Sequence, residues 1–517
     1  MVDLNCLKDH SSKGMENQKF SLKEITETIL KMEVDLGLLR DESYGPHARL
    51  AWEASRFIFS EELQRQLGLT EEDHTSPLNF KRMKLPQLLR LAVNAIYDCT
   101  VKSPIFAPRG RDFLVFPFMR RKLASDGLYD DLYTDHFIPM LGEANTVMIE
   151  HPYSVSRLHF EPTRNSPVWY SDIIFIASEV IKRFWSNKKH DLKITEMALA
   201  VQSYLNKYFG VMLDSVGITR SRFVSLSARR LAFRWMLRLL KPKVIFLICS
   251  YGQEALLLAA KDLHIKTVEM QHGAISPFHL GYSVPPGETK LSFPHFLFLF
   301  GSFWKNTVNY PIIDEHLFSI GYPYFDEQRR SFSQIKKENN IVIISQQNIG
   351  VQLSLFAVEL AKRIHGSRRV IYKLHPHEYA IWKDDYPLLY QSVKNGIIDI
   401  VDGDTPSLYQ LLAEAKWQIG VNSTALFEGL AFGCITILAD IPGIEYMQPL
   451  IDSGHVMVAK NASDIDFSEN SYALKFNTVN FFNPNWSDAF RIAMEYIIKN
   501  EIKSYNKEDT REKYKAT

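Results

Sequence analysis

The chain has 517 residues, more than one hydrophobic core normally serves, so two large domains are expected. Its composition, with 46% hydrophobic and 12% aromatic residues, excludes an extensively disordered protein. The net charge of +1 gives no sign of polyanion binding, so we expect no nucleic acid among the partners.

The first part of the chain is expected to be mainly helical. Residues 1–20 are polar, without an apolar stretch after a charged start, which predicts a loose tail and no secretory signal. From 21 to 100, apolar residues recur at spacings of three and four, which is typical of amphipathic helices. Two strand-like apolar runs and two helical stretches follow, at 112–118, 145–152, 171–186 and 192–209.

Residues 219–241 form a long basic segment with Arg230, Arg234, Arg238 and Lys241 at near-helical spacing. Such a helix can rest on an anionic membrane surface, whereas the alternative is an ordinary helix with a solvated basic face. No uncharged apolar run of about 18 residues predicts a transmembrane helix. The four cysteines include no CxxC pair and indicate reduced thiols. We therefore expect a cytoplasmic protein, with peripheral contact to the inner face of the membrane as an option.

From residue 243 onward, strand and helix patterns alternate, which argues for parallel α/β sheets. The first series occupies 243–249, 252–263, 266–271 and 295–301. The stretch 319–340 is polar and charged, and we expect the domain junction there. The second series occupies 340–346, 352–364, 368–376, 378–394, 397–403, 407–415, 417–422, 423–433 and 434–440.

Two such series predict an α/β protein with two Rossmann-like domains whose parallel sheets face a central cleft. The expected division is a loose tail at 1–20, a first domain with a helical N-terminal extension at 21–325, a second domain at 326–480, and a C-terminal helix with a charged tail at 481–517. In open parallel sheets, ligands bind beyond the carboxyl ends of the strands. The residues just after each apolar run are therefore the candidates for a site.

The stretch GVNSTALFEGLAFG at 420–433 is the most informative of these strand ends. Asn422, Ser423 or Thr424 can cap the following helix, and its free N–H groups with the hydroxyls suit a phosphate oxygen. Glu428 lies one turn beyond Thr424 on the same face and can accept bonds from ribose hydroxyls. The alternative is an ordinary capped helix that packs on a sheet.

The strand end YKLHPHE at 372–378 is a second candidate. Pro376 holds the turn rigid, and Lys373 adds positive potential beside His375. Donors of this kind stabilise a phosphate group as its bond to a sugar breaks. The alternative is a structural histidine. A metal site is not favoured, because no HxxxH motif or carboxylate cluster lies nearby.

The strand end EMQHG at 269–273 is a third candidate. Gly273 permits a tight turn and close ligand approach after Gln271 and His272. A histidine can take a proton from a hydroxyl group at neutral pH. Glu269 lies three residues earlier on the strand and points to the opposite face, so it is a poor candidate for orienting His272.

The segment 116–135 is rich in charge. One interpretation is a loop whose arginines, Arg120 and Arg121, meet an anionic ligand. The other is a solvated loop of mixed charge. Asp126, which follows a strand and precedes Gly127, is a second candidate for a base.

A histidine before a glycine in the first half, a K-x-H-P strand end and a Ser-Thr helix start with a downstream acid together resemble the GT-B glycosyltransferases that build bacterial surface polymers. The most similar patterns are those of CDP-glycerol glycerophosphotransferases, capsule Kdo transferases and bacterial sialyl- and polysialyltransferases. The resemblance covers about 243–445, under half of the chain. It implies a GT-B-like fold with an acceptor-side first domain and a donor-binding second domain.

By this resemblance, His272 matches the base, His375 the histidine of the HP pair, and Ser423 with Thr424 the hydroxyl pair. Gln271 stands where a WHG-type segment has tryptophan, and Ser125-Asp126-Gly127 meets the sialyltransferase pattern of two acids before glycine only in part. The base stays open between His272 and Asp126. The expected donor-side residues are Lys373, His375, Pro376, Asn422, Ser423, Thr424 and Glu428, and the acceptor-side residues are Arg120, Arg121, Gln271 and Gly273.

The resemblance implies a metal-independent inverting glycosyltransferase, or a glycerophosphotransferase-like enzyme, without a cofactor. It would move a sugar from a nucleotide-activated donor of the CMP or CDP type to a surface-polysaccharide or lipid-linked glycan acceptor. One alternative is a nucleotide-sugar epimerase of the same fold, which usually carries a glycine pair where this chain has Ser423 and Thr424. The other is a non-catalytic glycan-binding protein.

Overall fold

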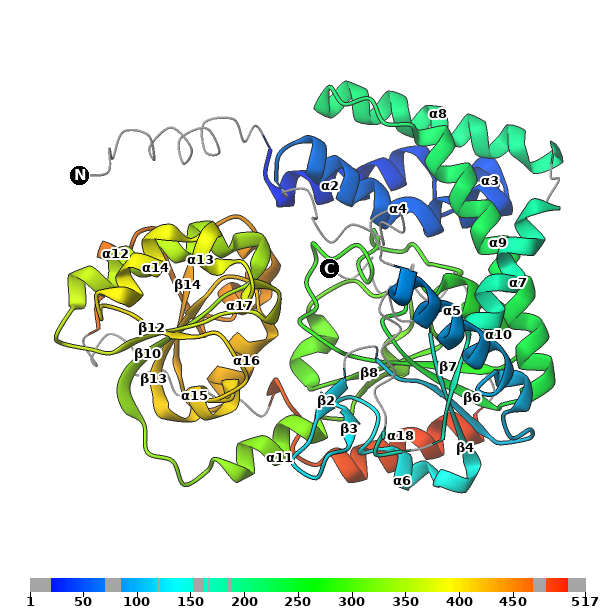
Figure 1. The fold of residues 1–517 in the computed structure, drawn as a ribbon. Helices are drawn as coiled ribbons and strands as arrows, with labels where there is room; N and C mark the ends of the chain where they lie inside the picture. Colours follow the sequence, from blue (N-terminus) through cyan, green and yellow to red (C-terminus); the bar gives the residue numbers. More distant parts are fainter. Residues whose placement is uncertain are drawn as a thin grey trace.

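The structure is a computed structural model, and it describes residues 20–69, 85–118, 121–151, 162–165, 167–184, 188–467 and 480–500. Two separate parallel sheets form the centres of two domains that lie side by side (Figure 1). Helices cover both faces of each sheet, as in Rossmann-like domains. The predicted fold class is confirmed as α/β, with two Rossmann-like domains built on parallel sheets.

The first sheet has seven parallel strands in the order β5-β4-β1-β6-β7-β8-β9. Their bounds are β1 Phe113–Phe116, β4 Thr146–Glu150, β5 Val168–Tyr170, β6 Val244–Ile248, β7 Lys266–Met270, β8 Phe296–Leu299 and β9 Leu317–Ser319. Every residue of β1, β6 and β8 is buried, because helices cover both faces of the sheet. The strand order changes direction between β1 and β6, which is the kind of position where α/β sheets bind ligands.

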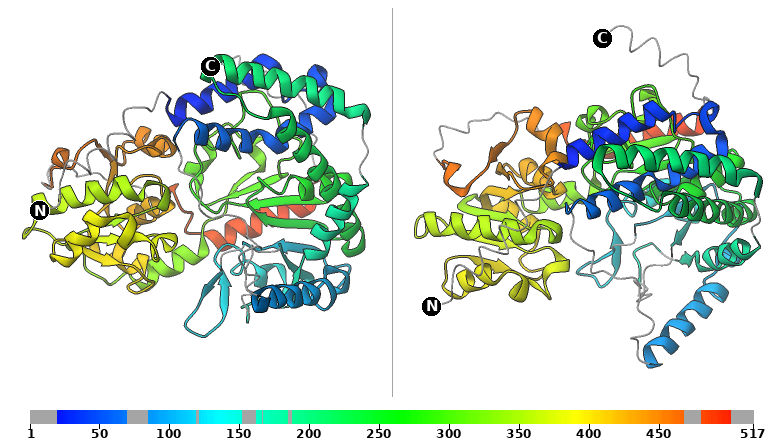
Figure 2. Two further views of the ribbon diagram at one scale, coloured as in Figure 1. Left: turned by 45° about the horizontal axis from the view of Figure 1, so that its top comes forward. Right: turned by 90° about the horizontal axis from the view of Figure 1, so that it is seen from above.

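Helices from distant parts of the chain cover this sheet. One face packs against α7 (Asp172–Arg183), α9 (Ser215–Leu240) and α10 (Glu254–Asp262). The other face packs against α6 (Ile138–Leu141) and α18 (Trp486–Lys499). The helix α18 follows the second domain in sequence, but Figures 1 and 2 show it, in red, beside the first sheet. The ring of its Phe490 stacks on Phe137 with centroids 4.5 Å apart.

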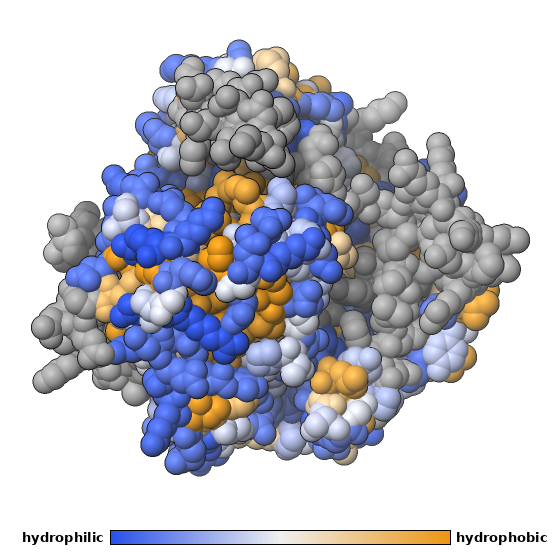
Figure 3. Space-filling model, turned by 60° about the vertical axis from the view of Figure 1, so that its left-hand side comes forward, coloured by the Kyte–Doolittle hydropathy of each residue, from blue (hydrophilic) through white to orange (hydrophobic). Residues whose placement is uncertain are grey.

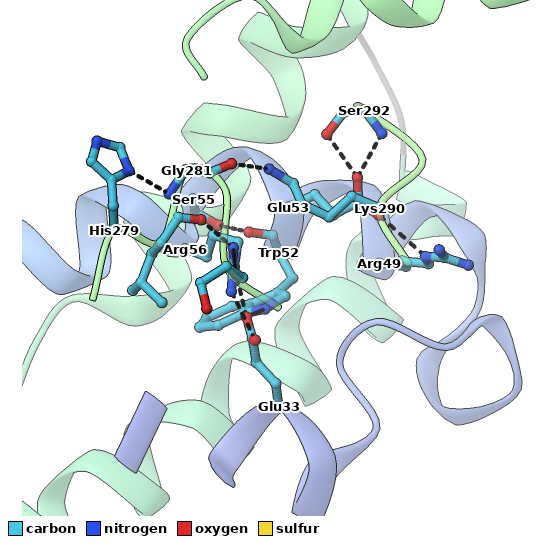
Figure 4. Close-up of polar contacts among 12 residues, drawn as sticks. Glu33, Arg49, Trp52, Glu53, Ser55, Arg56, His279, Gly281, Lys290 and Ser292 are labelled. Carbon is cyan, nitrogen blue, oxygen red and sulfur yellow. Dashed lines mark hydrogen bonds and ion pairs between the residues drawn. The ribbon is translucent and has the colours of Figure 1, made fainter. Parts of the chain in front are cut away.

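The N-terminal helices form a layer over the first domain (Figures 1 and 2). The helices α2 (Leu22–Leu36), α4 (Pro46–Gln66) and α8 (Lys188–Phe209) enclose a separate apolar cluster, next to the short α3 (Asp41–Tyr44). Buried hydrogen bonds join α4 to the loop between β7 and β8 (Figure 4). The helix α5 (Leu85–Thr100) contacts α7, and an antiparallel hairpin of β2 (Arg121–Leu123) and β3 (Tyr129–Asp131) follows β1.

The second sheet has six parallel strands in the order β12-β11-β10-β13-β14-β15. Their bounds are β10 Glu338–Ile344, β11 Val370–Lys373, β12 Asp399–Val401, β13 Ala415–Gly420, β14 Ile435–Ala439 and β15 Met457–Ala459. The strand order changes direction between β10 and β13. The loops after these two strands therefore flank the position where such sheets bind ligands.

The connection between the sheets carries α11 (Pro323–Ser331). The helices of the second domain are α12 Gly350–Ile364, α13 Trp382–Asp385, α14 Pro387–Lys394, α15 Leu408–Glu414, α16 Thr424–Ala431 and α17 Gln448–Asp452. On the side shown in Figure 3, most described residues are hydrophilic and the hydrophobic ones form patches between them. This side is therefore a mixed surface and not one continuous apolar face.

The basic segment forms the middle and end of α9. Its Arg230 is bonded to Asp262 of α10 at 2.8 Å, and Arg234 lies 3.4 Å from the same carboxylate. These pairs neutralise part of the basic face. Within the described part of the chain, no helix is both long and apolar enough to cross a membrane. Contact of α9 with a membrane surface stays a prediction.

Candidate functional site

The two domains meet at the carboxyl ends of β7 and β13. The backbone N–H of Ala274 in the first domain donates to Thr424 Oγ1 in the second, at 2.9 Å. A Cβ atom at Gly273 would lie 3.3 Å from the same oxygen, so the two backbones approach closely here. The turn after His272 therefore lies against the N-terminus of α16. The sequence predicted three separate strand-end candidates. The structure brings two of them, 269–273 and 420–433, into direct contact.

The ring of His272 is surrounded by groups from two other strand ends. Its Nε2 lies 3.1 Å from the Tyr251 hydroxyl and 3.1 Å from Cys249 Sγ, while Phe118 stacks on the ring with centroids 5.7 Å apart. The carbonyl oxygen of His272 accepts a hydrogen bond from the Tyr133 hydroxyl at 2.9 Å. Burial raises the pKa of Tyr251 far above its ordinary value, so its hydroxyl stays protonated.

Phe118, Cys249 and Tyr251 were not recognised in the sequence. Phe118 follows β1, and the other two follow β6, on either side of the point where the strand order reverses. Cys249 has φ 61°, a left-handed conformation that is costly for a residue with a Cβ atom. The strand-end rule would have found these residues if the order of the strands had been known.

Two of the residues expected near an acceptor lie elsewhere. Gln271 is buried, and its side-chain amide joins the N–H of Phe300 at 2.7 Å to the carbonyl of Gly273 at 2.8 Å. The Arg121 side chain is fully buried and pairs with Glu150 at 2.6 Å. Neither side chain faces a ligand, because each satisfies an internal partner. Arg120 lies outside the described residues.

Asp126 lies in the turn of the β2–β3 hairpin and not beside His272. Its carboxylate accepts a hydrogen bond from the N–H of Leu128 at 3.1 Å and pairs with Arg164 at 3.0 Å. The hydrogen bond from Leu128 and the pairing with Arg164 lower the pKa of Asp126. An ionised, paired carboxylate is a weak base at neutral pH, so this placement favours His272.

The N-terminus of α16 has the expected cap. Ser423 Oγ accepts a hydrogen bond from the N–H of Ala425 at 3.3 Å. The carbonyl of Asn422 accepts a bond from the Gln346 side chain at 3.4 Å, which links the loops after β13 and β10. The side-chain oxygens of Asn422 and Gln346 are both buried without a hydrogen-bond partner. Gln346 was missed because its importance depends on β10 and β13 being neighbours.

The turn at His375 is held by its own capping bonds. Its Nδ1 accepts the N–H of His377 at 3.3 Å, so in the neutral ring the proton lies on Nε2. Its backbone N–H donates to Glu378 at 2.6 Å, and Pro376 begins the short 3₁₀ turn. Lys373 is nearly buried, and its Nζ donates to the Tyr379 hydroxyl at 2.8 Å and to the carbonyl of Gly403. Lys373 therefore supports the neighbouring loops.

Glu428 lies inside the domain and not at the mouth of the α16 N-terminus. It is buried, and its Oε1 accepts a hydrogen bond from the Tyr409 hydroxyl at 3.1 Å. Burial raises the pKa of Glu428 to about 7, and the hydrogen bond from Tyr409 offsets this shift only in part. The expected contact with a ribose is therefore not available in this conformation.

We expect the substitution Glu428→Gln to stabilise the protein at high pH. As the pH rises from about 4.5 to 7, the unfolded chain releases this proton first, so the folded state loses stability over that window. Glutamine has no proton to lose and keeps an acceptor for Tyr409. The melting temperature of the variant relative to the wild type should be higher at about pH 8 than at about pH 5. The same difference in melting temperature at both pH values would contradict this expectation. The control is Glu495→Gln, on the exposed face of α18.

Among the described residues, no group of three or more histidine, cysteine, aspartate or glutamate side chains is arranged to hold a metal ion. The candidate residues are a histidine at the end of β7, a helix N-terminus with two hydroxyls after β13, and a histidine at the end of β11. The chain that carries them is an α/β protein with two Rossmann-like domains.

No protein-family model matches the chain, and no curated protein matches it. Among solved structures, it is similar to UDP-GlcNAc 2-epimerase from Methanocaldococcus jannaschii, with 12% identity over 74% of this chain and 98% of that one and a TM-score of 0.42. It is also similar to the Neisseria meningitidis UDP-GlcNAc 2-epimerase bound to UDP-GlcNAc, with 14% identity over 53% of this chain and 82% of that one and a TM-score of 0.36. A spinosyn rhamnosyltransferase shares 12% identity over 75% of this chain and 96% of its own, with a TM-score of 0.33. Likenesses this distant carry no information on activity.

Proposed function

We propose that the protein is a metal-independent inverting glycosyltransferase. The donor is a nucleotide-activated sugar of the CMP or CDP type, bound by the second domain, and the acceptor is a surface-polysaccharide or lipid-linked glycan on the first. The hydrogen bond from Ala274 to Thr424 carries the proposal, because it sets a base candidate against a helix N-terminus suited to a phosphate. An inverting transfer needs these two groups on opposite sides of one sugar carbon.

In the proposed reaction, His272 takes the proton from the acceptor hydroxyl. The hydroxyl oxygen then attacks the anomeric carbon, and the bond from this carbon to the donor phosphate breaks with inversion. The phosphate leaves with the bonding electrons and is stabilised by the N–H groups at the start of α16, by Ser423 and by the Nε2 proton of His375. If His272 donates its Nε2 proton to Tyr251, at 3.1 Å, its Nδ1 is the basic nitrogen.

The test has two stages on the full chain. Calorimetric titration with CMP, CDP and UDP should find one nucleotide that binds, since the proposed site recognises a nucleotide phosphate. The matching nucleotide sugars are then incubated with and without a glycan acceptor and followed by NMR. Nucleotide release that depends on the acceptor supports transfer. Conversion of the donor sugar to its epimer without an acceptor would show an epimerase, and the absence of nucleotide binding would leave a glycan-binding protein.

We expect His375→Ser to lower kcat by about 10²–10³ with little change in fold, as for the loss of one donor to a developing charge. Serine keeps a side-chain acceptor for the N–H of His377, so the turn is preserved. His377→Ala is the matched control, because this ring lies 4.8 Å from that of His375 on the same exposed turn. Circular dichroism checks the fold, and steady-state kinetics measures the effect. Equal activity in both variants would make His375 a structural residue.

A further inference from the structure

A pocket of about 670 Å³ lies between the β2–β3 hairpin and α11, apart from the residues described above at the domain boundary. Its size is that of many small-molecule sites. The hairpin side contributes Lys122, Asp126 and Asp130, and the opposite wall contributes Tyr324 and Glu327 of α11. The pocket therefore opens where the first domain joins the connection to the second.

The charge of the pocket is mainly negative. Four carboxyl groups line it, those of Asp126, Asp130, Asp135 and Glu327, against the two cations of Lys122 and Arg164. Arg164 is already paired with Asp126 at 3.0 Å and with Asp130 at 2.5 Å. The carboxyl groups outnumber the cations of the walls, so an anionic ligand is disfavoured, because like charges brought together are costly. The pocket thus suits a neutral or cationic ligand, the opposite of the anionic ligand that the arginines of this segment suggested.

Two buried polar atoms of the pocket residues have no hydrogen-bond partner. Asp135 is only 4% exposed; its Oδ2 accepts the N–H of Asp131 at 2.7 Å, but its Oδ1 accepts no bond. His136 pairs through Nε2 with Glu327 at 3.1 Å, while its Nδ1 is unpartnered. Buried polar atoms are rarely left in this state. Both residues line the pocket, so a hydrogen-bonding ligand that reaches these atoms would satisfy them.

The composition of the walls matches a sugar. The hydroxyl groups of a saccharide can donate to the carboxylate oxygens of these walls. The Tyr324 hydroxyl is held by Lys122 Nζ at 2.8 Å, which fixes this wall. Leu123 and Pro139 add apolar surface.

Contacts link the pocket to both halves of the candidate site. The carboxylate of Asp131, next to Asp135, accepts the N–H of Phe118, whose ring stacks on His272. On the other side, the ring centroids of Tyr324 and Tyr409 lie 6.1 Å apart, and the Tyr409 hydroxyl donates a hydrogen bond to Glu428 of α16. We propose that the pocket binds a neutral or amine-bearing sugar unit of the acceptor, remote from the unit that receives the transferred sugar. The assignment of this sugar unit to the acceptor rests on the proposed function, whereas the binding of a sugar in the pocket does not.

The first experiment screens the full chain on an array of neutral, amino and acidic saccharides. We expect the bound saccharides to be neutral or amine-bearing. The affinity of the best one is then measured by calorimetry for the wild type, Asp126→Asn and Glu327→Gln. Both side chains are largely exposed, with 49% and 65% of their surface accessible, so the fold should tolerate these changes. Each should weaken binding by about tenfold or more, as for a lost hydrogen bond to a charged group.

Asp488→Asn is the matched control, because Asp488 is an exposed carboxylate paired with an arginine at 2.8 Å, as Asp126 is, but on α18. It should bind the saccharide as the wild type does. The proposal is overturned if no saccharide binds, if acidic saccharides bind best, or if neither pocket variant loses affinity. Titration with nucleotides is run on the same samples. Sugar binding without nucleotide binding would refute the proposed transferase but support the sugar-binding pocket. Nucleotide binding without sugar binding would refute the sugar-binding pocket alone.

Discussion

The substitution His272→Ala should lower the rate of transfer by about 10²–10⁴, the usual effect of losing a general base. The affinity for the nucleotide should change little, because the proposed phosphate contacts lie on the second domain. The two quantities are measured separately, by single-turnover kinetics at saturating donor and by calorimetry with the free nucleotide. A parallel loss of both would show that the ring holds the domain boundary together and does not act on the acceptor.

Two comparisons make this result specific. His365→Ala removes an exposed histidine at the end of α12 and should leave the rate unchanged. Asp126→Asn tests the rival base. Since Asp126 is ionised and paired with Arg164, we expect this variant to retain much of its chemical rate and to lose affinity for the acceptor instead. An inactive Asp126→Asn beside an active His272→Ala would assign the base to the carboxylate.

The domains could be predicted because several of their strands are nearly continuous apolar runs. Val244–Ile248 and Ile435–Ala439 are almost completely buried, as is typical of parallel strands covered on both faces. Several of the shortest strands were missed. Val168–Tyr170, Leu317–Ser319 and Met457–Ala459 have three residues each, too few to show a period.

Candidate residues at strand ends could be predicted because parallel strands deliver their carboxyl ends to one edge. The same rule says nothing about the order of the strands, so it could not single out Cys249, Tyr251 or Gln346, which flank the reversals of strand order. The polar residues Arg121 and Glu428 were expected to face ligands but are buried. The residue type does not reveal whether a side chain is already paired with an internal partner, such as Glu150 for Arg121 or Tyr409 for Glu428.

The largest effect on stability is expected at Arg56, in the middle of α4. Its guanidinium pairs bidentately with Glu33 at 2.7 and 2.8 Å, and both side chains are essentially inaccessible to solvent (Figure 4). The same group donates to the carbonyls of Leu280 and Ser283 in the loop after β7, which also contains His272. Glu33 also accepts the indole N–H of Trp52 at 2.8 Å. Arg56 therefore joins the N-terminal layer to this loop, whose residues lie more than 200 positions away, and no local pattern could reveal that link.

Replacing Arg56 with methionine leaves Glu33 buried without its cation. Breaking a buried pair in this way costs about 3–5 kcal/mol, whereas surface pairs contribute below about 1 kcal/mol. Arg65→Met is therefore the control, because Arg65 is on the same helix and pairs with Glu62 at the surface. Since a two-domain protein need not unfold in one step, hydrogen exchange of peptides from α4 and from residues 279–284 is the suitable measurement. Their opening free energy should fall in Arg56→Met, while peptides from β10 and β13 stay protected. An equal decrease in opening free energy in Arg65→Met, or an equal loss of protection in both domains, would show that Arg56 does not specifically stabilise this loop.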